Sequence, residues 1–101
     1  MQNFRTLKLA TEFYTRCKAV RLPSHLKNQL LRASSSVALN LMEGRGRAST
    51  RDQKRFFTIA FGSIRECQAI VTLESESFDT ESQQILDLLA ASCFKLIRNA
   101  G

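Results

Sequence analysis

Two long segments of helical periodicity are separated by the stretch Asn40-Leu41-Met42-Glu43-Gly44-Arg45-Gly46-Arg47-Ala48-Ser49. Glycine tolerates positive φ after a helix end, so Gly44 and Gly46 predict a turn that stops the preceding helix. Ser49, with Asp52 three residues later, resembles a helix N-cap followed by an acid in the first turn. The stretch therefore predicts a tight corner between two helices, and with it a helical fold.

Helical periodicity extends outward from this corner along most of the chain. We expect helices over about residues 3–20, 23–42, 50–77 and 81–99. Pro23 suits the first turn of the second helix, and Thr80 with Gln83 forms a capping box at the start of the fourth. No strand or hairpin pattern interrupts these segments. The sequence predicts one domain over residues 1–101, an all-α, antiparallel up-down four-helix bundle.

The spacing of apolar residues also predicts which side of each helix faces the core. Gly62 lies inside the third helix, where glycine costs up to about 1 kcal/mol against alanine, and it predicts a tight helix crossing. The small residues Ser34-Ser35-Ser36 predict close approach of a neighbouring helix. The expected inward residues are Leu7, Ala10, Tyr14 and Cys17; Leu26, Leu30, Ala33, Val37 and Leu41; Phe56, Ala60, Ser63, Ile64, Cys67, Ile70 and Val71; and Ile85, Leu88, Leu89, Ser92 and Leu96.

Several classes of site and location are disfavoured by composition. Cys17, Cys67 and Cys93 show no metal-ligand spacing and only one histidine accompanies them, so we expect core thiols, no metal and no cofactor. The N-terminus lacks the apolar region of a signal peptide, which favours a cytoplasmic location. No apolar run approaches the roughly 20 residues that span a bilayer, so no membrane association is expected.

The charge balance favours an anionic partner. The chain has 15 Lys+Arg against 9 Asp+Glu, a formal net charge of +6, which suits nucleic acid or another acidic partner. The alternative is a basic surface that is merely solvated. The candidate nucleic-acid-binding residues cluster at and after the corner: Arg45, Arg47, Arg51, Lys54 and Arg55. We expect the first helix to add charge through Arg5, Lys8, Arg16, Lys18 and Arg21.

Two aromatic residues directly follow this basic cluster. Aromatic rings beside basic residues can stack on exposed bases, which is one interpretation of Phe56 and Phe57. In a long amphipathic helix at least one of them is expected to be core. The remaining alternative places Phe57 in a subunit interface.

Polar residues on apolar faces form a second candidate constellation. Asn40 and Glu43 are three residues apart on the second helix, and Ser63 and Glu66 have the same spacing on the third. A half-buried glutamate needs a cation, for which Arg32, Arg47 and Arg65 are candidates. We favour a hydrogen-bond network that fixes helix register over a ligand pocket. An enzyme using Glu43 and Glu66 is a weaker alternative, because no catalytic constellation accompanies them.

The motifs around the corner resemble those of a known family. Residues 40–47, followed by Arg55-Phe56-Phe57-Thr58-Ile59-Ala60-Phe61-Gly62-Ser63-Ile64-Arg65-Glu66, resemble the "four-helix bundle protein" family, also called the rRNA intervening-sequence proteins. The accessory variability determinants of diversity-generating retroelements are similar. The chain departs from the family pattern by apolar exchanges: Leu41-Met42 stands for Ile-Ala, and Phe57 and Cys67 each stand for Leu.

The resemblance implies a homo-oligomeric ring, commonly a pentamer, with a basic surface able to bind nucleic acid. In the retroelement relatives it also implies a reverse-transcriptase partner. Our leading hypothesis is a non-enzymatic homo-oligomer that binds structured RNA or DNA through phosphate contacts. The alternative is an adaptor that recruits a nucleic-acid enzyme such as a reverse transcriptase.

Overall fold

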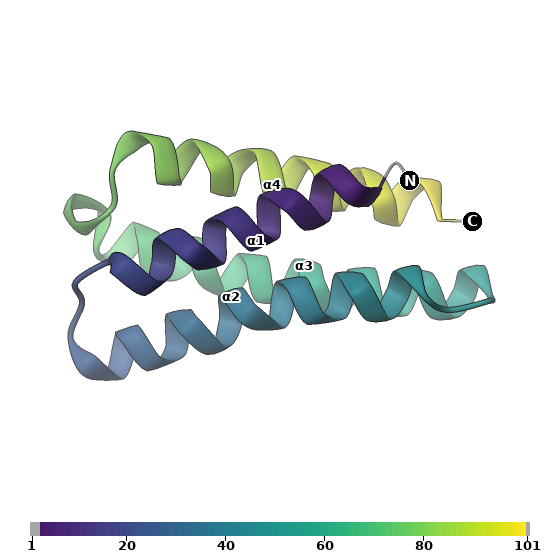
Figure 1. Ribbon diagram of the computed structural model, residues 1–101, viewed down its shortest axis with the longest axis horizontal. Helices are drawn as coiled ribbons and strands as arrows, with labels where there is room; N and C mark the ends of the chain where they lie inside the picture. Colours follow the sequence, from purple (N-terminus) through teal and green to yellow (C-terminus); the bar gives the residue numbers. More distant parts are fainter. Residues whose placement is uncertain (1–2, 101) are drawn as a thin grey trace.

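Antiparallel helices account for almost all of the chain in the computed structural model, which describes residues 3–100 (Figure 1). The ends of the predicted domain, Met1, Gln2 and Gly101, lie outside that range. Each helix packs against two neighbours, so that α1 contacts α2 and α4, and α3 contacts the same two helices. The predicted all-α four-helix bundle is confirmed. Its elements are α1 (Asn3–Ala19), α2 (Ser24–Arg45), α3 (Thr50–Leu73), the short 3₁₀ helix η1 (Ser75–Ser77) and α4 (Thr80–Asn99).

The corner between α2 and α3 differs from its prediction in the role of its glycines. Helix α2 continues through Gly44 to Arg45, and Gly46 has a φ of −83°, in the ordinary right-handed region. A Cβ atom at Gly44 would lie 2.8 Å from Cε1 of Phe57. Gly44 is therefore required for the close approach of α3, and neither glycine provides the predicted positive φ.

Side-chain caps explain where the last two helices begin. Ser49 Oγ accepts a hydrogen bond from the Asp52 amide at 3.1 Å, which confirms the predicted N-cap of α3. At α4 the cap is Asp79 rather than Thr80, because Asp79 Oδ1 accepts from the Ser82 amide at 2.7 Å. This bond holds the pKa of Asp79 below its usual range. Helix α3 ends at Leu73, four residues before its predicted end, and η1 leads into this cap.

The core lies along the central seam where the four helices meet. Its centre contains Phe13, Leu30, Ile64 and Leu89, each at most 1% exposed. Several inward positions differ from the prediction, since one residue along a helix rotates the side chain by about 100°. The rotation buries Thr6, Phe13 and Phe57, whereas the predicted Leu7, Tyr14 and Phe56 are half-buried and Leu88 is 47% exposed.

Gly62 does not mark a tight crossing within this chain. The residue is exposed, and a Cβ atom added to it would meet nothing within 4 Å. The prediction was wrong because Gly62 lies on the outward side of α3, whereas the close approach to α2 occurs at Gly44.

All three thiols lie in the core, as predicted. Cys17, Cys67 and Cys93 are free and buried. Burial raises the pKa of Cys17 and of Cys93 to about 12, and raises that of Cys67 still further. Since the thiolate is the reactive species, these residues are protected both by exclusion of solvent and by protonation.

We therefore expect no fast-reacting thiol in the native protein at pH 8. A chromogenic disulfide reagent should titrate Cys17, Cys67 and Cys93 only after a denaturant is added. A thiol that reacts in the native protein as fast as free cysteine would contradict the packing described above.

Among the residues that the structure describes, one helix is long and apolar enough to cross a membrane by length and composition alone. It is α3, whose best window has a mean hydropathy of 1.2 and is 39% buried. Its buried residues, from Phe57 to Val71, face α2 and α4 and form part of the core. Packing within the bundle accounts for the apolar residues on the buried side of this helix.

Candidate nucleic-acid interface

The antiparallel topology gathers three parts of the chain at one end of the bundle. The α2–α3 turn lies beside the start of α1 and the end of α4 (Figure 1). The halves of the four helices that lead to this end, together with the α2–α3 turn, carry nine basic residues and two acids. They are Arg5, Lys8, Arg45, Arg47, Arg51, Lys54, Arg55, Lys95 and Arg98, with Glu43 and Asp52. We call this the basic end.

The opposite end has nearly balanced charge. Its basic residues are Arg16, Lys18, Arg21, Lys27, Arg32 and Arg65, and its acids are Glu12, Glu66, Glu74, Glu76, Asp79, Glu81 and Asp87. The formal charge of +6 is therefore concentrated at the basic end. Sequence order alone does not show this polarity, because it depends on which helix ends lie together.

Two arginines at the corner share one aromatic ring. The guanidinium carbon of Arg47 lies 4.8 Å from the centroid of Phe56, and that of Arg55 lies 4.5 Å from it. Arg47 also pairs with Glu43, and Arg55 with Asp52 at 3.9 Å. These contacts hold the two cations in place at modest energy, about 0.5–1 kcal/mol for each exposed cation–π pair.

The arrangement changes the interpretation of the two aromatic residues. Phe57 is 4% exposed and belongs to the core of the single chain. Phe56 is half-buried, and two guanidinium groups lie over its ring. The corner thus presents cations suited to phosphate, and the ring of Phe56 positions them rather than offering an open face for a base.

The other three corner residues lie close by on both helices. Arg51 and Lys54 are exposed on the first turns of α3, and Arg45 is half-buried in the last turn of α2. The turn itself is held by Gln53, whose Nε2 donates to the Arg47 carbonyl at 3.0 Å. All five predicted residues are therefore brought to one corner.

The contribution predicted for the first helix divides between the two ends. Arg5 and Lys8 lie at the basic end, whereas Arg16, Lys18 and Arg21 lie at the other. Arg16 also has a structural role. Its guanidinium nitrogens lie 2.9 Å from a carboxylate oxygen of Glu81 and 3.8 Å from one of Asp79 and one of Glu12. Its salt bridges join α1 to the start of α4.

Sequence reasoning missed two cations at the basic end, Lys95 and Arg98. Both are exposed in the last turns of α4. The signal that would have identified them is topological, because an antiparallel bundle places the end of its fourth helix beside the turn between its second and third.

The predicted polar network is present with two of its four members, Asn40 and Ser63, and they are joined through Ser36. Ser36 Oγ lies 3.0 Å from Ser63 Oγ, and Asn40 Nδ2 donates to the Ser36 carbonyl at 2.9 Å. Glu43 and Glu66 are exposed and lie outside this network. The network therefore links α2 to α3 through small hydroxyl groups, which need no buried countercharge.

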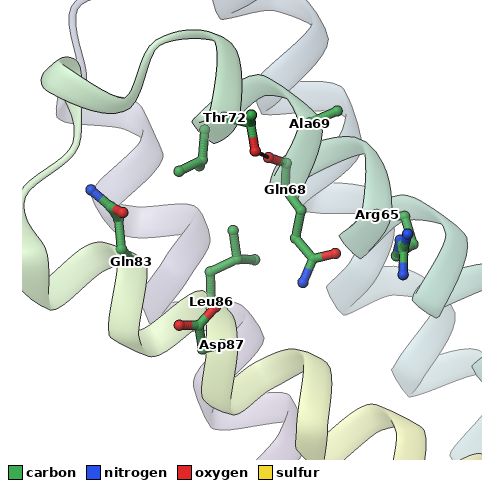
Figure 2. Close-up of a pocket in the computed structure, with 8 residues that line it drawn as sticks. Arg65, Gln68, Ala69, Thr72, Gln83, Leu86 and Asp87 are labelled. Carbon is green, nitrogen blue, oxygen red and sulfur yellow. Dashed lines mark hydrogen bonds between the residues drawn. The ribbon is translucent and has the colours of Figure 1, made fainter.

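A groove between α3 and α4 lies away from the basic end (Figure 2). It has a volume of about 500 Å³ and is lined by residues that include Arg65, Gln68, Gln83 and Asp87. Arg65 and Asp87 carry opposite charges, so the groove has no preference for an anion. Within residues 3–100, no group of three or more His, Cys, Asp or Glu residues is placed to hold a metal ion.

Comparison of the sequence with known families gives a match. The profile described as "23S rRNA-intervening sequence protein" matches residues 4–99. The chain belongs to that family. No curated protein matches the chain in a sequence search. In this member of the 23S rRNA-intervening sequence protein family, the apolar exchanges at Phe57 and Cys67 both fall on buried positions of α3.

Proposed function

We propose that this member of the 23S rRNA-intervening sequence protein family is a non-enzymatic homo-oligomer that binds structured RNA or DNA. Binding takes place through phosphate contacts at the basic end, with Arg45, Arg47, Arg51, Lys54 and Arg55 as the principal residues. The observation that carries the proposal is the concentration of positive charge at one end of the bundle. Contacts of this kind provide affinity without base specificity.

Helix stability does not explain Arg51. The N-terminus of a helix carries partial positive charge, so a cation in its first turn is unfavourable by roughly 0.3–1 kcal/mol. Arg51 nevertheless lies in the first turn of α3, beside Asp52, whereas Lys54 and Arg55 follow in the second turn. A role in binding an anion accounts for the placement of Arg51.

Self-association is supported by exposed apolar side chains on α2 and α3. Among residues 5–100, four large hydrophobic residues of these two helices are at least 43% exposed: Leu39, Met42, Ile59 and Leu73. Surfaces of this kind are commonly covered by a protein partner. The family resemblance implies a ring, commonly a pentamer, which would multiply the positive charge presented to one nucleic acid.

The proposal is tested by measuring binding to three labelled probes at two salt concentrations. The probes are duplex DNA, an RNA hairpin and a single strand, and the protein is nuclease-treated and of measured oligomeric size. We expect micromolar or tighter binding that falls steeply with salt. Absence of binding at low salt would overturn the proposal.

The same exposed residues favour a second candidate function. Leu39 and Met42 are three residues apart on α2 and are 65% and 57% exposed. They would suit a protein partner such as a reverse transcriptase, as the similarity to accessory variability determinants implies. Capture of one defined partner that survives nuclease treatment would support this adaptor function. Capture that disappears with nuclease would support the nucleic-acid function instead.

A further inference from the structure

A second cationic surface lies at the basic end, between α1 and α4. A groove of about 650 Å³ lies there, with an apolar side formed by Leu88, Ala91, Phe94 and Leu96 and a polar side formed by Arg5, Thr6, Ser92, Lys95 and Asn99. None of the described residues that line it is acidic. The groove is distinct from the corner, which is formed by α2 and α3.

We propose that this groove is a second phosphate-binding site, and that one nucleic acid lies across the end of the bundle and contacts both the corner and the groove. The inference rests on the proposed function and extends it from one corner to the whole end surface. Arg5 and Lys95 are the expected ligands within the groove. Arg98 is the expected ligand at its rim, where its guanidinium carbon lies 6.0 Å from the ring centroid of Phe94.

Local stability explains these cations only in part. Lys95 and Arg98 lie in the last turns of α4, where a cation favours the helix dipole. Arg5 is unfavourable for the dipole of α1, because it is a cation in the first turn of that helix and no acid accompanies it there. Ser92 Oγ is hydrogen-bonded to Thr6 Oγ1, so the polar side chain left for a ligand beside the cations is Asn99. The convergence of Arg5 and Lys95 on one groove, with Asn99 beside them, is the arrangement that points to an anionic ligand.

The size of the end surface suits one extended polyanion. The bundle measures 40 × 23 × 18 Å between Cα atoms, so its end is about 23 Å across. Duplex DNA carries one charge per about 1.7 Å of its axis, so a segment crossing the end presents roughly a dozen phosphates. Screening over about 8–10 Å at physiological salt limits each cation to nearby phosphates. On this proposal the corner and the groove contact different phosphates of the same segment.

The decisive experiment compares two double variants that have the same net charge. Lys95→Gln with Arg98→Gln removes two cations from the basic end, and Lys18→Gln with Arg21→Gln removes two exposed cations from the opposite end. We expect the first pair to weaken duplex binding about tenfold or more and to lower the salt slope by about 1.8. The second pair should stay within about twofold of the wild type. Equal effects of the two pairs, or no effect of the first, would overturn the inference.

A fluorescence measurement locates the ligand independently of affinity. The chain has no tryptophan, so Phe94→Trp places a single reporter at the groove. Its emission should change on saturation with duplex DNA, whereas Leu73→Trp at the opposite end should stay constant. Unchanged Phe94→Trp emission while the DNA is bound would overturn the inference and leave the proposed function standing. Failure of the wild type to bind any probe would instead overturn the proposed function.

A second copy of the chain is the competing occupant of the groove. In that case Phe94→Trp emission should vary with protein concentration in the absence of nucleic acid. The Lys95→Gln, Arg98→Gln pair would then change the oligomeric size more than the affinity for DNA. That combination of results would also overturn the inference.

Discussion

Replacing Arg47, Arg51 and Arg55 together with alanine should weaken binding to duplex DNA and to RNA hairpins alike. At about 0.15 M salt, release of counterions by each phosphate contact favours binding about fivefold, so three lost contacts predict roughly a 100-fold loss. The slope of log K against log salt should become shallower by about 2.7. The loss should be uniform across sequences, because these residues are expected to contact phosphates and not base edges. Fluorescence anisotropy over a range of salt concentrations measures both quantities.

A matched triple variant separates position from net charge. Lys18, Arg21 and Arg32 are exposed at the end with balanced charge, and their replacement by alanine removes the same three charges. Thermal unfolding provides the second control, since loss of the contacts to Phe56 by Arg47 and Arg55 removes up to about 1 kcal/mol each. If the folded corner variant retains wild-type affinity and salt slope, the corner is not the binding surface.

The helices and their order were predictable because local signals agreed along the chain. The apolar period of α2, the N-cap at Ser49 and the short connections each favoured the same antiparallel bundle. The position of a helix end was less certain, because α2 passes through Gly44 without interruption. A glycine near a predicted helix end is ambiguous until the neighbouring helix is placed.

Which side chain of a helix faces the core was harder to predict where two adjacent residues are both apolar. Phe56 and Phe57 differ by about 100° around α3, and composition alone cannot choose which faces the core. The structure buries Phe57, which leaves Phe56 beside the guanidinium groups of Arg47 and Arg55. This choice determines the chemistry of the corner, because it converts an aromatic residue from a base-stacking candidate into a support for two cations.

Only the corner of the candidate site could be predicted from the sequence, because the rest of the site depends on the topology of the bundle. Arg45 and Arg55 are close in the sequence, so their cluster could be found by inspection. Lys95 lies at the same end only because α4 runs antiparallel to α3. Arg16 lies at the opposite end, beside Glu81, because α1 begins at the basic end and runs away from it. The grouping of charge depends on contacts between helices, and residue spacing within one helix does not contain that information.

The packing at Gly44 leads to an expected loss of stability on its replacement by alanine. An alanine Cβ would lie 2.8 Å from Cε1 of Phe57 and 3.0 Å from Cβ of Phe56. The Phe57 ring is 4% exposed within the core, so α2 and α3 would have to separate or repack around the new methyl group. Overpacking of this kind costs about 1–3 kcal/mol, which exceeds the roughly 1 kcal/mol that alanine gains over glycine in a helix.

Gly62→Ala provides the matched control, because it makes the same exchange in a helix where the added Cβ meets nothing within 4 Å. There the gain in helix propensity is unopposed, and we expect stabilisation by about 0.5–1 kcal/mol. Urea unfolding followed by circular dichroism measures both changes on the same scale. The two substitutions should thus shift the free energy of unfolding in opposite directions. Equal stabilisation by both would show that α3 does not require glycine at position 44, and that the close approach of α2 and α3 tolerates a side chain.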